Sequence, residues 1–207
     1  MSKIFALSGF GLRAQGKESF MRVITGSARG RKLITVPGME VVRPTTDRVK
    51  EALFSAVQFE IEGALVVDLF AGSGQLGIEA LSRGARGAVF IDSSRQSIDV
   101  IKQNLSITGL MKQARVALMD ALSFLRSTHE RFDLAFLDPP YHSGLIQQAL
   151  PLLGERMQGG GMILCETDRG EKLPEESGPF RIARRYRHSK TIITLYRKAE
   201  GEWPYSG

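Results

Sequence analysis

The chain has 207 residues, of which 43% are hydrophobic and 24% are charged, and its net charge is +6. This composition is that of a globular protein with one sizeable core, and no apolar run reaches the length of a membrane span. The single cysteine, Cys165, excludes an internal disulfide and a cysteine-rich metal site. It favours a reducing compartment, so we expect a cytoplasmic protein.

The basic residues are concentrated at the two ends of the chain. Residues 1–50 carry ten Lys/Arg and three Asp/Glu, and residues 181–198 carry seven Lys/Arg and no acid. The middle, residues 51–180, has eleven basic and seventeen acidic residues. This distribution suggests a polyanionic partner that is approached from the termini, although two solvated basic faces would explain the same pattern.

The N-terminal part of the chain is predicted to have three pieces. Residues 1–20 lack regular periodicity and an adequate signal-peptide core, so we expect an upstream extension or a disordered leader. Residues 21–42 contain two β-rich pieces around a Gly/Arg-rich turn, which predicts a small basic β-hairpin. From Pro44 onward, apolar residues recur at helical spacing. They are Val49, Ala52, Leu53, Ala56 and Val57.

From residue 64 the sequence alternates between strand and helix patterns. We expect helices over 75–84, 93–109, 121–127 and 144–157, the last divided or kinked by Pro151, and strands over 64–70, 87–92, 114–120, 132–141 and 160–167. Two more strands are predicted within residues 180–198. Such alternation is typical of βαβ units with right-handed crossovers and a parallel sheet. We therefore predict one α/β domain over residues 43–198, followed by a tail over 199–207.

Four predicted strands end in or near an aspartate: Asp68, Asp92, Asp120 and Asp138. Each residue alone is most often a helix cap or a turn residue. In a parallel sheet, however, all four would stand on the carboxyl edge, where ligands bind. The set therefore predicts a shared polar site.

The loop after the first of these strands contains Gly72-x-Gly74-x-x-Gly77, with Asp92 twenty residues after Gly72. This spacing matches the dinucleotide fingerprint and would suit a nicotinamide cofactor. Any nucleoside-containing cofactor can use a glycine loop and a ribose-binding carboxylate. Asp68 suits a cationic amino-acid moiety better than a pyrophosphate, because an ammonium group pairs with a carboxylate.

The segment "AFLDPPYHSG" ends the fourth strand with a carboxylate, two prolines and an aromatic ring. Asp138 and the Pro139 carbonyl can accept both hydrogens of an exocyclic amine. Pro140 restricts the backbone that carries these acceptors, and Tyr141 offers a stacking surface. The three histidines lack metal-ligand spacing, so we predict no metal site.

"DLFAGSG" resembles motif I of class I S-adenosylmethionine-dependent methyltransferases, and "DPPY" resembles their amino-methylating motif IV. The resemblance implies that S-adenosylmethionine is the cofactor. Asp68 and the glycine loop would then hold its methionine part, Asp92 its ribose, and Asp120 with Ala121 its adenine. The implied cofactor set is Asp68, Phe70, Ala71, Gly72, Ser73, Gly74, Asp92, Ser93, Asp120, Ala121 and Asp138.

From Met21 to about Lys198 the chain resembles the RsmD-type 16S ribosomal RNA guanine-N(2) methyltransferases. The matching pieces are "MRVITGSARGRKL", "RPTTDRVKEALF", "VVDLFAGSGQLGIEALSRGA", "FLDPPY" and "TIITLYR". The resemblance implies a bacterial enzyme acting on 16S RNA or an assembling small subunit, and we expect a monomer. It also implies a Rossmann-like, mostly parallel seven-stranded sheet with helices on both faces and a small N-terminal β-hairpin. The expected RNA contacts are Arg29, Arg31, Lys32, Arg43 and Arg48.

Three alternatives remain open on the sequence. A DNA adenine or cytosine amino-methyltransferase can share "DPPY", but such enzymes usually need an added target-recognition region that this chain has no room for. An NAD-dependent oxidoreductase would explain the glycine spacing and leave Asp68 and "DPPY" unexplained. The third alternative is an RNA-binding assembly factor without catalytic activity. The only argument against it is that the chain retains every hydrogen-bond acceptor that methyl transfer to an amine needs.

Overall fold

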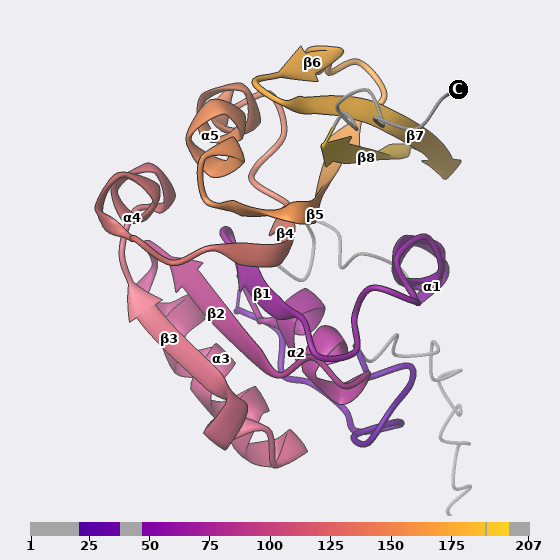
Figure 1. The fold of residues 1–207 in the computed structure, drawn as a ribbon. Helices are drawn as coiled ribbons and strands as arrows, with labels where there is room; N and C mark the ends of the chain where they lie inside the picture. Colours follow the sequence, from indigo (N-terminus) through magenta and orange to yellow (C-terminus); the bar gives the residue numbers. More distant parts are fainter. Residues whose placement is uncertain (1–20, 38–46, 189, 199–207) are drawn as a thin grey trace, which may run out of the picture.

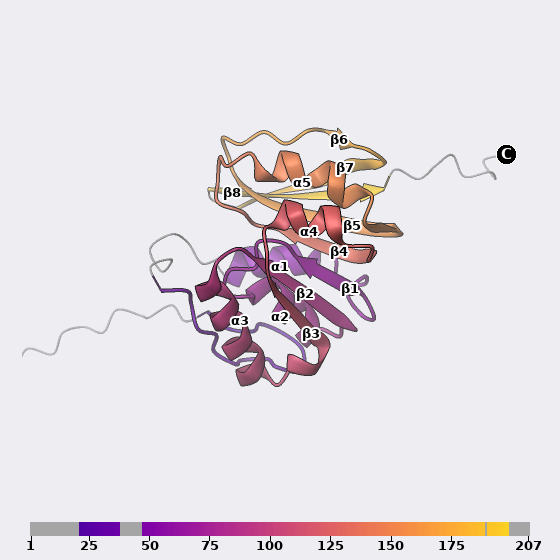
Figure 2. The same ribbon diagram turned by 90° about the vertical axis from the view of Figure 1, so that its left-hand side faces the viewer.

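The computed structural model describes residues 21–37, 47–188 and 190–198, which form an eight-stranded mixed sheet with helices on both faces (Figures 1 and 2). The predicted leader over residues 1–20 and the tail over 199–207 lie outside the described residues. The elements in chain order are α1 (Asp47–Ser55), β1 (Leu65–Asp68), α2 (Gln75–Ser82), β2 (Gly87–Asp92), α3 (Arg95–Thr108), a 3₁₀ turn (Met111–Gln113), β3 (Ala114–Leu118), α4 (Ala121–Ser127), β4 (Phe132–Leu137), α5 (Leu145–Gly154), β5 (Met157–Asp168), β6 (Glu176–Ser177), β7 (Phe180–His188) and β8 (Thr191–Lys198).

The first five strands are parallel and lie in the order β3-β2-β1-β4-β5. The central strand β1 pairs with β2 on one side and β4 on the other, so Val67 lies opposite both Val89 and Ala135. Helices cover both faces, which is why these strands read as continuous apolar runs. The strand order reverses between β1 and β4, the place where ligands bind in open α/β sheets.

The last strands are antiparallel to their neighbours. β8 inserts between β5 and β7, and the two-residue β6 closes the edge by pairing with β7. The predicted Rossmann-like fold is confirmed, with eight strands in the described residues instead of the expected seven. The extra strand is β6, which is too short to produce an alternating pattern in the sequence. Pro151 lies inside α5 without dividing it.

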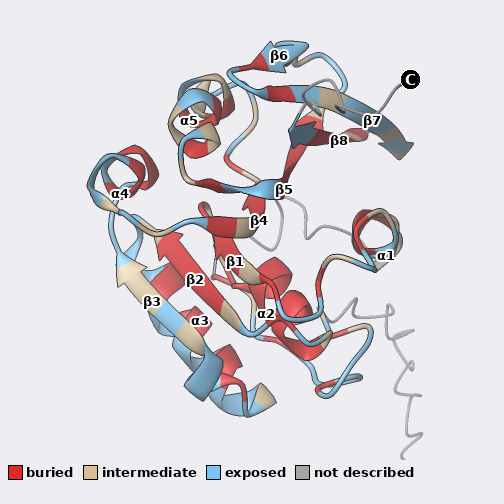
Figure 3. Cartoon of the chain, viewed as in Figure 1, coloured by how far each residue is buried: buried red, intermediate tan, exposed pale blue. Residues whose placement is uncertain are grey.

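Two hydrophobic cores lie on opposite faces of the sheet. The first packs α1, α2 and α3 against the sheet, and the second packs α4 and α5 against the other face. The central strands and α2 are almost wholly buried, whereas β3 and β7 are largely exposed or half-buried (Figure 3). The carboxyl ends of β1, β2 and β4 are therefore fixed by packing from both sides, which makes this edge a rigid base for a site.

The N-terminal segment over residues 21–37 pairs with itself at the predicted hairpin, without forming regular strands. The antiparallel bridge of Arg22 with Lys32 is flanked by backbone bonds from Val23 to Arg31 at 3.0 Å and from Leu33 to Met21 at 2.8 Å. Other backbone N–H groups of the segment bond to side chains of α2 and α3: Ile24 and Thr25 donate to Glu79, at 2.7 and 3.0 Å, and Ile34 donates to Asn104 at 2.7 Å. The segment is thus a short hairpin held against the helices, and it contributes to the first core.

Candidate cofactor and substrate site

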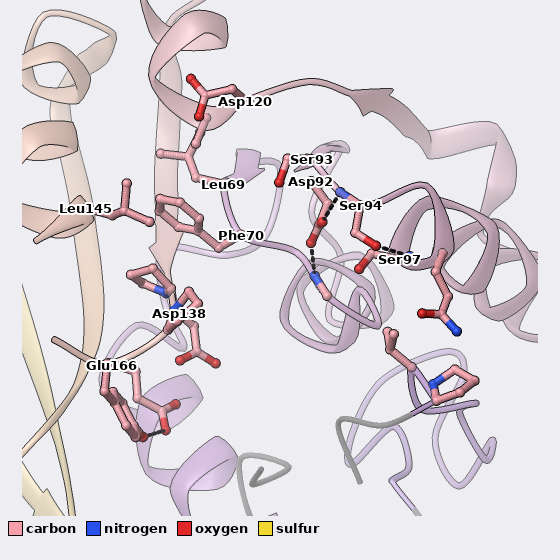
Figure 4. A pocket seen from close by; sticks show the side chains of 18 residues that line it. Leu69, Phe70, Asp92, Ser93, Ser94, Ser97, Asp120, Asp138, Leu145 and Glu166 are labelled. Atoms are coloured by element: carbon pink, nitrogen blue, oxygen red, sulfur yellow. Dashed lines mark hydrogen bonds between the residues drawn. The ribbon is translucent and has the colours of Figure 1, made fainter. Parts of the chain in front are cut away.

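A cavity of about 480 Å³ opens at the carboxyl edge of the parallel strands, where strand order reverses (Figure 4). Asp92 ends β2, Asp138 follows β4, Asp120 follows β3, and all three line the cavity. The sequence prediction of a shared polar site at this edge is therefore met by three of its four aspartates. The lining residues are Val36, Pro37, Leu69, Phe70, Gly72, Asp92, Ser93, Ser94, Gln96, Ser97, Asp120, Ala121, Asp138, Pro139, Pro140, Tyr141, Leu145 and Glu166.

Asp92 connects the glycine loop to the start of α3. The backbone N–H of Gly72 donates to Asp92 Oδ2 and the N–H of Ser94 donates to Oδ1, both at 2.8 Å. Figure 4 shows these two bonds at the cavity wall. A carboxylate can accept about four hydrogen bonds, so Asp92 can also accept from hydroxyl groups of a ligand in the cavity.

The glycines of the loop have separate roles. Gly72 lines the cavity with φ of +53°, and a Cβ there would meet no atom within 4 Å, so the space beside it is open. At Gly77, by contrast, a Cβ would lie 2.3 Å from the Phe90 ring. Gly77 therefore permits close packing of α2 on β2 and does not face the ligand space, which is the role of the third glycine in such loops.

Asp68 is not among the residues that line the cavity, and the contact with the methionine part that the resemblance implied stays a prediction. Its side chain is buried, with 1% exposed, and Oδ2 accepts the Gly77 N–H at 3.1 Å. Burial, assisted by the charge of Asp92, raises its pKa to about 7, and the Gly77 bond opposes that shift. Asp68 positions the first turn of α2 from behind the glycine loop.

The other predicted cofactor residues divide in the same way. Phe70, Gly72, Asp92, Ser93, Asp120, Ala121 and Asp138 line the cavity. Ala71, Ser73 and Gly74 do not, because their side chains or backbone turn toward the core: the Ser73 carbonyl, for example, accepts from Asn104 at 2.9 Å. These three residues form the part of the glycine loop that packs behind the cavity-lining residues.

Asp120 stands at the exposed end of the cavity as the N-cap of α4. Its Oδ1 accepts the Ser123 N–H at 2.8 Å, and hydrogen bonds from Ser123 lower the pKa of this carboxyl. A carboxylate acceptor at this position can bind a polar N–H group of a ligand.

The predicted catalytic segment forms the opposite end of the cavity. Asp138, Pro139, Pro140 and Tyr141 all line it. The Tyr141 hydroxyl donates to Glu166 Oε1 at 3.4 Å, and the Glu166 side chain is only 5% exposed (Figure 4). Leu137 pairs with Cys165, so Asp138 and Glu166 are neighbours on adjacent strands. Two carboxyl groups and a ring therefore face one space.

Glu166 was not among the predicted site residues. The available signal was a carboxylate at the end of the apolar run "GMILCE", the same pattern that identified the four aspartates. Val36 and Pro37 also line the cavity and were not predicted, because their place depends on the loop packing of residues 21–37. A local sequence pattern does not report such packing.

Beyond the catalytic segment, His142 ties the loop to the end of β5. It has a positive φ of 56°, its backbone N–H donates to Glu171 at 3.2 Å, and its Nε2 lies 3.4 Å from Asp168 Oδ1. Within the described ranges no cluster of His, Cys, Asp and Glu could hold a metal ion. None of the helices in those ranges combines the length and apolar character that crossing a membrane requires.

The predicted RNA contacts are separated from the cavity. Arg29, Arg31 and Lys32 are exposed. The turn that carries Arg29 bonds to Ser82, since Ser27 and Ala28 donate to its carbonyl and hydroxyl oxygens. Ser82 ends α2, whose eight residues span about 12 Å from the cavity end. Arg43 and the side chain of Arg48 lie outside what the structure describes.

Known proteins are similar to this chain in sequence over most of its length. The family model for conserved hypothetical protein 95 matches residues 21–197. The YlbH protein of Bacillus subtilis is 40% identical over 183 residues, which are 86% of this chain and 99% of that protein. The ribosomal RNA small subunit methyltransferase D of Escherichia coli is 37% identical over 185 residues, covering 88% and 92%.

The structural comparison agrees. The solved structure of yhhF from Escherichia coli superposes with a TM-score of 0.75 at 36% identity, covering 86% of this chain and 98% of that one. The structure of HI0767 from Haemophilus influenzae gives a TM-score of 0.73 at 33% identity, with 87% and 99% covered. The match of fold and sequence extends over both the cavity and the C-terminal strands. The chain belongs to the conserved hypothetical protein 95 family, the RsmD-type family of the class I methyltransferase fold.

Proposed function

We propose that this protein transfers the methyl group of S-adenosylmethionine to the exocyclic N2 amine of a guanine in 16S ribosomal RNA. The observation that carries the proposal is that Asp138–Tyr141 and Asp92 line one cavity at the point where strand order reverses. One end can hold a nucleoside cofactor and the other a planar amine. The name of the Escherichia coli relative supports the substrate class.

The residues present fit S-adenosylmethionine. The cavity volume lies in the range of small-molecule sites. Asp92 would accept from the ribose hydroxyls, Phe70 and Leu145 would pack on the adenine, and Asp120 would lie near its amine. The open space beside Gly72 would admit the amino-acid part. When bound, this cofactor supplies a methyl group on a positively charged sulfur.

The protein's own groups would prepare the amine. Its lone pair is delocalised into the guanine ring, so it is a weak nucleophile. Asp138 would accept one N–H and the Pro139 carbonyl the other, which holds the amine with its lone pair toward the methyl group. Tyr141 would stack on the base, worth about 1–3 kcal/mol in comparable sites.

The transfer then balances with no further reactant. A nitrogen–carbon bond would form as the sulfur–carbon bond of the cofactor breaks, and Asp138 or water would take the amine proton. The chemistry that the cofactor supplies would need no metal ion, because the transfer removes the positive charge of its sulfur. A guanine inside a helix would have to be flipped out first, whereas a guanine in a loop would not.

We further propose that the monomer acts in the bacterial cytoplasm, on 16S RNA or on an assembling small subunit. The experiment is to incubate the purified protein with labelled S-adenosylmethionine and small subunits from a strain lacking its own copy of the enzyme. Digestion of the RNA to nucleosides identifies the labelled base and atom. We expect N2-methylguanosine, and Asp138→Ala should reduce transfer at least 100-fold.

Asp99→Asn is the matched control, because Asp99 is an exposed carboxylate on α3 that pairs with Arg95 across the helix surface, away from the cavity lining. It should transfer label like the unaltered protein. Label on duplex DNA instead of ribosomal RNA, or full activity in Asp138→Ala, would overturn the proposal.

A further inference from the structure

The basic C-terminal strands reach the same edge of the sheet as the cavity. Glu166, which lines the cavity, pairs with Ile193 of β8, and Ile193 pairs with Tyr186 of β7. Cross-strand partners point to the same face of a sheet. Neighbouring strands are about 4.8 Å apart, so Tyr186 lies roughly 10 Å from Glu166 along this row. A few nucleotides of a bound RNA strand would cover that span.

The basic residues of β7, β8 and the turn between them include some that pair with a carboxylate and some that do not. Arg181, Arg185 and Arg197 are paired with Glu176, Glu175 and Glu60, at 3.2, 2.7 and 2.8 Å. Arg184 and Lys190 are exposed and have no carboxylate partner among the residues that the structure describes. Arg187 and Lys198 are exposed without such a partner among the described residues as well. Arg187 and Lys190 lie near the end of the strands that adjoins the cavity, Arg184 lies farther along β7, and Lys198 lies at the opposite end.

Arg184 and Tyr186 form a stacked pair on the face of the first core. Their partners on β8 are Leu195 and Ile193, which both belong to that core. The Arg184 guanidinium carbon lies 5.4 Å from the centre of the half-buried Tyr186 ring. Tyrosine rings and arginine planes are the side chains on which unpaired RNA bases stack.

The tip of the hairpin is joined to the catalytic segment. The Arg169 N–H donates to the Lys190 carbonyl at 3.2 Å, and Asp168 pairs with Thr191 in the sheet. Asp168 also contacts His142, the residue that follows Tyr141. Exposed Arg169 and Lys190 thus stand beside the loop that would hold the guanine. Figure 1 shows β7 and β8 side by side on the far side of β5 from the parallel strands.

We propose that Arg169, Arg184, Tyr186 and Lys190 form a second RNA-binding surface, the tip surface, which holds the strand flanking the target nucleotide. This inference rests on the proposed function for the identity of the RNA. Phosphates of the flanking strand would contact Lys190 and Arg169, and a neighbouring base would stack on Arg184 and Tyr186. The surface adds a binding region beside the cavity, whereas Arg29 lies at the far end of α2.

The test compares Arg184→Gln/Lys190→Gln with Arg187→Gln. Arg187 is exposed on the same strand, but it pairs with Ile192 and so faces the other side of the sheet. Dissociation constants for small subunits are measured by filter binding over a range of salt concentrations. The double variant should bind about 10-fold more weakly, and its salt slope should fall by roughly 0.7 for each phosphate that the protein no longer neutralises.

Arg187→Gln should keep both the affinity and the salt slope. Tyr186→Leu, which keeps an apolar side chain over the core, should weaken binding without changing the slope. If the double variant and Arg187→Gln have the same affinity and the same salt slope, the proposed tip surface is wrong. Because binding is measured directly, that result is distinct from a failure of methyl transfer by the unaltered protein, which would count against the proposed function instead.

Discussion

The two ends of the cavity are held by different kinds of hydrogen bond. At the Asp92 end, two backbone N–H groups bond to one carboxylate, both at 2.8 Å. At the Asp138 end, side-chain contacts at 3.4 Å join Tyr141 to Glu166 and His142 to Asp168, and the bond from the His142 backbone N–H to Glu171, at 3.2 Å, is longer than the two at the Asp92 end. Backbone groups cannot move without the elements that carry them. The Asp92 end is therefore set before a ligand binds, whereas the side chains of the Asp138 end can adjust to an entering base.

This contrast predicts that changes at the Asp92 end will alter cofactor binding or stability, and that changes at the Asp138 end will mainly alter RNA methylation. The largest effect is expected for Asp92→Ala. It leaves the Gly72 and Ser94 N–H groups without their acceptor and removes the acceptor for the ribose, and each bond to a charged group is worth about 1.5–3 kcal/mol. We expect S-adenosylmethionine affinity, measured by calorimetry, to fall at least about 100-fold.

Asp92→Asn retains one acceptor oxygen and should lose less affinity than Asp92→Ala. If both variants bind the cofactor as tightly as the unaltered protein, the Asp92 end is not the cofactor end.

The buried carboxyl of Asp68 should make folding stability depend on pH. Its pKa is about 7 in the folded protein, against 3.8 for the ordinary group. Between these values the folded state binds more protons than the unfolded state, so this carboxyl lowers stability as the pH rises. Asp68→Asn removes the titration. From pH 4.5 to pH 8 we expect the variant to gain on the order of 3 kcal/mol in unfolding free energy relative to the unaltered protein.

Urea unfolding at several pH values measures this difference. Parallel curves for the two proteins would contradict it.

Gly77→Ala tests the packing behind the Asp92 end. The added Cβ would lie 2.3 Å from the Phe90 ring, which is fully buried and leaves little room to move. Overpacking of this kind costs about 1–3 kcal/mol, so we expect the unfolding midpoint in urea to fall. Gly159→Ala is the control, since a Cβ there meets no atom within 4 Å. A shorter side chain at the partner, as in Gly77→Ala/Phe90→Leu, should restore part of the loss.

The sequence predicts the buried central strands and the helix α3 better than it predicts the side-chain contacts around the Asp138 end of the cavity. Continuous apolar runs reveal β1, β2 and β4 because both faces of the parallel sheet are buried. The serines and glycine that flank α3 mark its ends, since Ser94 caps the first turn and Gly109 adopts φ of 75° after the last. These signals are local, so a single sequence carries them.

The features that were missed depend on contacts between distant residues. Residues 21–37 pair as a short hairpin, but their place in the fold is set by backbone bonds to Glu79 and Asn104, which are more than fifty residues away. Asp68 ends a strand, and only the packing of α2 shows that its carboxyl accepts the Gly77 N–H. Glu166 enters the site through sheet pairing with the strand that precedes Asp138.

The smallest effect is expected at the Asp138 end, for Tyr141→Phe. The ring that would stack on the base stays, and the 3.4 Å bond to Glu166 is removed, a long bond that contributes little. We expect KM for small subunits to rise about 2- to 3-fold with cofactor affinity and the urea midpoint unchanged, whereas Tyr141→Ala should raise KM at least about 5-fold because the stacking surface is gone. If Tyr141→Phe instead weakens cofactor binding, the two ends are coupled and their separation is wrong. If Phe and Ala variants behave alike, the hydroxyl bond and not the ring is what positions the base.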